Sequence, residues 1–134
     1  MPLRRVKSYR FPSGIVWPLL QLNRPLADLA VFSTFEPERW EEDGLGHARG
    51  FFLALPSGRV VLVKEYDHAI AHGLSAGPEI DVDGREAAVE GFAAINDDVM
   101  DGLQIDEDLV DWRPDNLAQW SVDARDLINL RRSH

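Results

Sequence analysis

The sequence predicts an α+β fold, an antiparallel sheet built on a central β-hairpin at about residues 50–66 with C-terminal helices packed on it. Two patterns predict this fold. Short runs of β-branched and aromatic residues stand on either side of the turn Pro56-Ser57-Gly58, as is typical of a hairpin. From about residue 84 onward, apolar residues recur every three or four positions, as in amphipathic helices. Strands that precede helices along a chain are typical of α+β domains.

The chain is long enough for one hydrophobic core and has no cysteine for disulfides or thiolate metal sites. We divide its 134 residues into a basic N-terminal arm, residues 1–12, and a single α+β domain, residues 13–134. Arginine strongly outnumbers lysine, a bias that indicates a bacterial protein from a GC-rich genome. No stretch has the pattern of a signal peptide or a membrane-spanning helix, so the expected location is the cytoplasm.

Three segments lie between the arm and the hairpin. Ile15–Leu22 is apolar but contains Pro18, so we predict a short helix or an irregular packing segment. Leu29–Phe35 has high β propensity and predicts a strand. Glu36–Gly46 carries five carboxylates around Trp40 and predicts one helical turn or a surface loop. The arm itself predicts an extended segment at an edge of the domain.

The hairpin, Gly50–Tyr66, is the centre of the predicted sheet. Pro56 sets φ for the first turn position, and Gly58 takes the left-handed conformation that closes a three-residue loop. A side chain at Gly58 is expected to add about 1–2 kcal/mol of backbone strain. Both faces of the two strands are apolar near the turn, which predicts a position in the interior of the sheet.

After the hairpin, Asp67–Gly73 begins with a good N-cap residue and ends in glycine, which predicts one helical turn. Glu79–Val82 predicts a short edge strand. Asp83 and Glu86 have the spacing of a capping box, which opens a helix that runs to about Met100.

Two apolar stripes at helical spacing follow, separated by Leu103–Trp112, which predicts either a strand or a helical turn. The first stripe consists of Ala88, Phe92, Ile95 and Val99, and the second of Leu117, Trp120, Ala124, Leu127 and Ile128.

The formal net charge of −9 is unevenly distributed. Between Val60 and Trp112, fourteen acidic residues stand against only Lys64 and Arg85. Such an acidic balance disfavours nucleic acids and anionic membranes as partners, and it favours a basic protein surface or a cation.

These acids and two tryptophans form the candidate partner-binding site. Tryptophan side chains ringed by polar residues often dominate the energy of protein interfaces, so Trp40 and Trp112 are the predicted anchors if their side chains are exposed. The alternative for Trp40 is that its side chain folds back onto the core. The complete set is Trp40, Glu41, Glu42, Asp43, Asp97, Asp98, Asp101, Asp106, Glu107, Asp108, Asp111 and Trp112.

A second candidate is a metal or catalytic cluster after the hairpin. His68 and His72 stand four residues apart, so a helix would direct both imidazoles to one side. Glu65 or Asp67 supplies a third metal ligand, and the same groups can serve as a general acid and base.

A weaker metal pattern overlaps the predicted capping box. Glu79, Asp81, Asp83, Gly84 and Glu90 have the spacing of the ligand positions in a calcium-binding loop, which resembles the EF-hand pattern. The capping box explains the same residues with fewer assumptions.

No glycine-rich phosphate loop, nucleophile elbow or dinucleotide fingerprint occurs, so no cofactor is predicted. The leading hypothesis is a non-catalytic acidic module that binds a basic protein partner. In size, acidity and lack of cysteine the chain is similar to bacterial toxin-immunity proteins and antitoxins, a likeness of composition without a shared motif. The alternatives are a small metal-dependent enzyme or metal-binding protein that uses His68 and His72, and an assembly module that self-associates through a sheet edge or the C-terminal helix.

Overall fold

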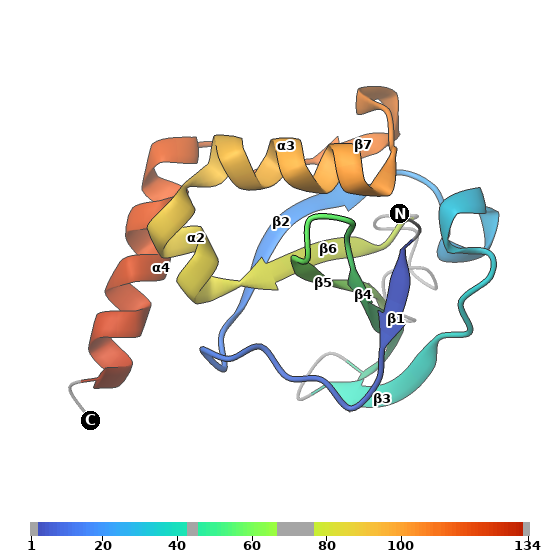
Figure 1. The fold of residues 1–134 in the computed structure, drawn as a ribbon, viewed down its shortest axis with the longest axis horizontal. Helices are drawn as coiled ribbons and strands as arrows, with labels where there is room; N and C mark the ends of the chain where they lie inside the picture. The colour runs from blue at the N-terminus through green and yellow to red at the C-terminus, as the bar shows by residue number, and fades with distance from the viewer. Residues whose placement is uncertain (1–2, 43–45, 67–76, 133–134) are drawn as a thin grey trace.

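The computed structural model describes residues 3–42, 46–66 and 77–132, and it confirms the α+β fold (Figure 1). Within these residues seven strands form one antiparallel sheet in the order β1-β4-β5-β6-β2-β7, and β3 also pairs with β4. The strands are β1 (Arg4–Val6), β2 (Val16–Leu22), β3 (Glu38–Glu42), β4 (Gly46–Ala54), β5 (Val60–Tyr66), β6 (Glu79–Asp83) and β7 (Val110–Trp112). The helices are α2 (Gly84–Glu90), α3 (Phe92–Leu103) and α4 (Leu117–Arg132), with short 3₁₀ helices η1 (Leu26–Asp28), η2 (Ala30–Phe32) and η3 (Glu107–Leu109).

The predicted hairpin is confirmed as β4 and β5. Phe51 lies opposite Val63 in the antiparallel register, and β5 lies between β4 and β6 in the interior of the sheet. The backbone N–H of Gly58 donates to the carbonyl of Leu55 at 2.8 Å, and the N–H of Leu55 donates to the carbonyl of Arg59 at 2.8 Å. Gly58 has φ of +95°, so the turn requires glycine for its backbone conformation.

Part of the basic arm belongs to the sheet. Strand β1 pairs with the end of β4, at the edge opposite β5. Beyond β1, the rings of Tyr9 and Phe11 pack edge-on against Phe52, with centroids 5.1 Å and 5.3 Å away. The arm therefore continues across the face of the sheet that carries Phe52.

The prediction for Ile15–Leu22 was wrong, because this segment forms strand β2 between β6 and β7. The register with β6 shifts between Pro18 and Leu20. Proline lacks a backbone N–H, and a bulge is one of the few places where a sheet tolerates it. Pro18, the residue that argued against a strand in the sequence, thus lies at a local irregularity within strand β2.

The prediction of a strand at Leu29–Phe35 was also wrong. The chain forms η2 there instead, shortly after η1. Leu26, Leu29 and Phe32 recur every three residues, which is the period of a 3₁₀ helix, and all three are buried. Packing of these side chains into the core therefore overrides their β propensity.

Glu36–Gly46, predicted as a helical turn or loop, contains β3. Charged side chains suit a strand at the edge of a sheet because they discourage pairing with other chains. Glu79–Val82 is a strand as predicted, but β6 lies between β5 and β2 rather than at an edge. The sequence pattern showed neither β3 nor β2, the strand that pairs with the outer side of β6.

The helix predicted from Asp83 is two helices. The Asp83 carboxylate accepts from the backbone N–H of Arg85 at 3.2 Å, which confirms the N-cap. Gly91, with φ of +86°, separates α2 from α3. The predicted stripe of Ala88, Phe92, Ile95 and Val99 is buried.

The C-terminal helix α4 lies beside α2 in Figure 1. Trp120 is buried, packs edge-on against Phe92 at 5.2 Å, and donates through Nε1 to the carbonyl of Pro18 at 2.7 Å. The segment Leu103–Trp112 contains both η3 and β7. No helix in the described part of the chain combines the length and apolar character needed to cross a bilayer.

Candidate functional site

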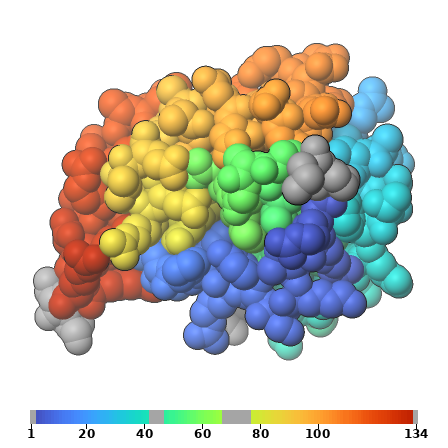
Figure 2. Space-filling view, in the orientation of Figure 1, coloured from blue at the N-terminus to red at the C-terminus, as the bar shows by residue number. Residues whose placement is uncertain are grey.

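The predicted partner-binding residues lie in two separate places. In Figure 1, α3 and β7 lie along the upper rim of the molecule, whereas β3 lies at its lower end. Figure 2 shows the atoms of α3 and of the segment up to β7 as one continuous rim. We call the predicted residues on this rim the acidic ridge. It consists of Asp97, Asp98, Asp101, Asp106, Glu107, Asp108, Asp111 and Trp112.

Arg113 holds the acidic ridge together. Its Nε donates to Asn96 Oδ1 on α3 at 3.1 Å, and its two terminal nitrogens donate to the Glu107 carboxylate on η3 at 2.5 Å and 2.9 Å. These hydrogen bonds lower the pKa of Glu107 below its ordinary value. These hydrogen bonds connect the two acidic segments to each other.

Between these segments lies an open hollow of about 470 Å³. Its walls are Asn96, Asp97, Met100, Asp101, Gln104, Ile105, Asp106 and Glu107. The carboxylates of Asp97, Asp101 and Asp106 are exposed, and none of them forms an ion pair with another residue that the structure describes. Their negative charge is therefore concentrated over one shallow, open surface.

Trp112 is the last residue of β7, directly before Arg113, and it is 43 % exposed. Its backbone pairs with Gln21 of β2, which fixes the position of this strand on the sheet. A large aromatic side chain that remains partly exposed is a suitable interface anchor.

Asp98 differs from the rest of the ridge because its carboxylate belongs to a cluster around Arg59. Arg59 is 10 % exposed and forms ion pairs with Glu86, Glu90 and Asp98. These contacts fasten the tip of the hairpin to α2 and α3. Glu86 is therefore engaged with Arg59, and burial raises its pKa despite the opposing effect of the guanidinium. The partners are 27 to 39 residues from Arg59 in the sequence, so no local pattern pointed to this cluster.

The second group of predicted residues does not join the acidic ridge. Trp40 is half-buried and lines a separate hollow of about 350 Å³ with Phe52, Leu62 and Lys64. Glu41 is exposed on β3, and the side chains of Glu42 and Asp43 lie outside the described part of the structure. Trp40 thus belongs to a different surface from the acidic ridge.

Lys64, on the wall of this hollow, forms a buried pair with Asp81. Lys64 Nζ is 3.3 Å from Asp81 Oδ2 and 3.5 Å from Glu79 Oε2. Burial raises the pKa of Asp81 well above its ordinary value, Glu79 adds to this, and Lys64 opposes it. Burial lowers the pKa of Lys64, but the carboxylates of Asp81 and Glu79 outweigh it and the net shift is upward.

The same residues overturn the calcium hypothesis. Glu79, Asp81 and Asp83 lie on strand β6 and not in a loop, and the last two are buried. A calcium loop needs several oxygens that converge on one point, which an extended strand does not provide.

The histidine cluster falls largely outside the described residues, which exclude Asp67, His68 and His72. Glu65 is buried at 1 % exposure and accepts from Arg49 Nε at 2.9 Å and from the backbone N–H of Leu26 at 2.7 Å. Both of its oxygens are thus engaged within the fold. In the part of the chain that the structure covers, no three histidine or acidic side chains are arranged to hold a metal ion.

A scan against protein-family models, a search of curated proteins and a search of solved structures find no match to this chain. The acidic ridge is the place where the residues predicted from the sequence come together in space. It combines a hollow, exposed carboxylates and an exposed tryptophan.

Proposed function

We propose that this chain is a non-catalytic binding module that engages a basic protein partner through the acidic ridge. One observation carries the proposal: Asp97, Asp101 and Asp106 surround a single hollow, exposed and without ion-pair partners among the described residues. A surface patch of one charge attracts oppositely charged partners and speeds their association. The composition favours an inhibitor of the immunity-protein or antitoxin kind as the form of this module.

Two features favour a protein over a free cation as the occupant of the ridge. The described acidic side chains are not arranged to converge on a metal ion. In addition, Trp112, on the strand that follows these acids in the sequence, exposes a large apolar surface, and such a surface gains energy only from a partner that covers it.

The first test compares two variants with the same net charge. In the ridge variant, Asp97, Asp101 and Asp106 become Asn. In the control variant, three exposed residues outside the ridge change: Asp28→Asn, Glu36→Gln and Asp126→Asn. Affinity capture from a bacterial lysate at low salt is expected to recover a basic protein with the native chain and the control, but not with the ridge variant. Equal recovery with both variants would place the interface elsewhere.

The second test separates the contributions of charge and of Trp112 by binding kinetics with the recovered partner. The ridge variant is expected to slow association by about tenfold at low salt, and the difference is expected to shrink at high salt. Trp112→Ala is expected to speed dissociation by about thirtyfold or more, because hot-spot truncations cost about 2 kcal/mol or more. Association rates that do not respond to salt contradict the proposal.

A further inference from the structure

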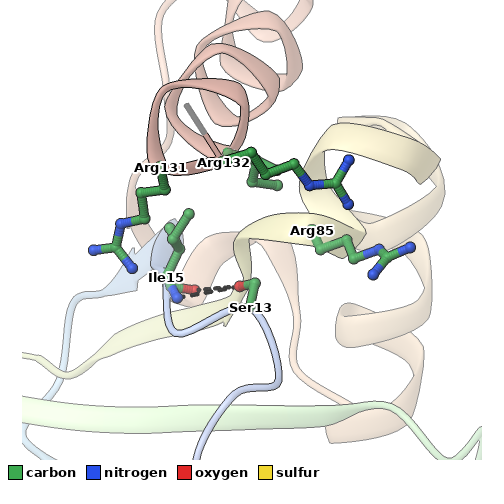
Figure 3. A pocket seen from close by; sticks show the side chains of 6 residues that line it. Ser13, Ile15, Arg85, Arg131 and Arg132 are labelled. Atoms are coloured by element: carbon green, nitrogen blue, oxygen red, sulfur yellow. Dashed lines mark hydrogen bonds between the residues drawn. The ribbon is translucent and has the colours of Figure 1, made fainter. Parts of the chain in front are cut away.

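A second hollow, of opposite charge, lies between the start of α2, the end of α4 and the loop before β2. It measures about 200 Å³, and its walls are Ser13, Ile15, Arg85, Ile128, Arg131 and Arg132 (Figure 3). Three arginines around one hollow stand out in a chain with a net charge of −9. We call this feature the arginine pocket.

The arginines of this pocket form no ion pair with a described carboxylate, unlike Arg49, Arg59 and Arg113. Arg59 and Arg113 form ion pairs with acidic side chains, and Arg49 pairs with Glu65. By contrast, neither Arg85 nor Arg132 forms an ion pair within the residues that the structure describes. Their positive charge is therefore available to a ligand.

Arg131 plays a different part from the other two. Its terminal nitrogen donates to the carbonyl of Gly14 at 3.1 Å, which ties the end of α4 to the loop before β2. Figure 3 shows Arg131 reaching to one side of Ile15, whereas Arg85 and Arg132 both reach to the other side. Arg131 thus shapes the pocket, and the other two arginines supply its free donors.

The acid nearest to Arg85 in sequence does not occupy the pocket. Asp83 is 3 % exposed and accepts hydrogen bonds from the Ser13 hydroxyl and from the backbone N–H of Arg85. Its carboxylate is therefore held by the protein. Ser13 also accepts from the backbone N–H of Ile15 at 3.1 Å, so its hydroxyl serves the loop.

We propose that Arg85 and Arg132 bind the phosphate group of a small soluble ligand. The planar guanidinium matches phosphate oxygens with two parallel N–H donors, and two such groups offset a dianion. A hollow of about 200 Å³ is smaller than the ~300–1,000 Å³ typical of drug-sized ligands, so it holds the phosphate and leaves the rest of the ligand outside. The acidic remainder of the chain repels an anionic membrane, which favours a soluble ligand.

The test uses inorganic phosphate as the probe and amide chemical shifts as the readout, with sodium chloride adjusted to keep ionic strength constant. Saturable shifts are expected for the amides of Ser13, Arg85 and Arg132. Arg85→Gln and Arg132→Gln are each expected to weaken binding by about tenfold, as loss of a charge-assisted contact predicts. Arg24→Gln removes the same charge at the other end of β2 and is expected to leave the affinity unchanged within about twofold.

Three results overturn the proposal. The first is a set of shifts that grow linearly and do not saturate. The second is an equal loss of affinity in Arg24→Gln, which would reveal only a general charge effect. The third is a protein that sediments with vesicles of equal parts phosphatidylcholine and phosphatidic acid but shows no amide shifts with inorganic phosphate. This result would mean that the pocket binds a membrane and not a soluble ligand. The ridge variant serves as a further control, because it is expected to bind phosphate as the native chain does.

Discussion

Asp97 and Asp98 are neighbours on α3, yet they belong to two different groups of acids. Asp98 accepts from Arg59 Nε at 2.7 Å and helps to fasten the hairpin to the helices. Asp97 faces the open hollow of the acidic ridge. Successive residues on a helix point about 100° apart, so adjacent aspartates reach different surroundings. The acidic residues of this chain therefore include two groups. One group forms ion pairs within the fold, and the other is free to contact a partner.

The largest expected effect comes from removing the centre of the first group. Arg59→Ala leaves the carboxylates of Glu86, Glu90 and Asp98 close together without their counter-charge. Their side chains are 25–39 % exposed and can regain water, so we expect a loss of about 2–3 kcal/mol in the free energy of unfolding, less than for a fully buried pair. Urea denaturation measures this loss. The exposed control Arg24→Ala is expected to stay within about 0.5 kcal/mol of the native chain.

A smaller effect is expected from Asp81, an acid that burial removes from water altogether. Its raised pKa means that the folded state binds a proton more tightly than the unfolded state does. This contribution to stability is complete below the ordinary carboxyl pKa of about 4, and it is lost as pH rises through the folded pKa. Asp81→Asn removes this titration.

Urea denaturation at a series of pH values between about 4 and 8 checks this expectation. The native chain is expected to lose more stability than Asp81→Asn as the pH rises through this range. Parallel curves for the two proteins would show that Asp81 titrates alike in the folded and unfolded states. Lys64, whose pKa is also raised, stabilises the fold throughout this pH range, and this contribution is lost only at alkaline pH, as the side chain deprotonates.

The elements predicted correctly from the sequence are those whose signals are local. Gly58 closes its turn through its own backbone conformation, and Asp83 caps the helix that begins after it. Strand β2 was not predicted because Pro18 argues against a strand in the sequence. In the structure Pro18 lies at an irregularity in the pairing of β2 with β6, and the sequence of β2 alone does not show that pairing. At Leu29–Phe35, burial in the core outweighed β propensity, and burial is a property of the whole fold.

The residues of the candidate site also divide into those that sequence proximity groups correctly and those that it does not. Sequence proximity sufficed to group Asp97, Asp101 and Asp106, since a short connection joins α3 to η3. It failed for Trp40, because β3 pairs with β4 at the opposite end of the molecule. It also failed for Asp98, whose partner Arg59 lies 39 residues away in the sequence. Contacts between distant segments decide which acids are engaged, and composition carries no information about them.

The smallest expected effect has the opposite sign and tests the second group of acids. Asp97 and Asp101 stand four residues apart on α3, where like charges repel by about 0.2–0.5 kcal/mol. Asp101 also lies in the last turn, where the helix dipole disfavours negative charge. Asp97→Asn with Asp101→Asn is therefore expected to raise the free energy of unfolding by about 0.2–0.5 kcal/mol, whereas Asp98→Asn lowers it. If the double variant loses stability instead, these carboxylates are engaged in the fold as Asp98 is. A gain means that the native ridge keeps charges that disfavour folding, as expected of residues that serve binding.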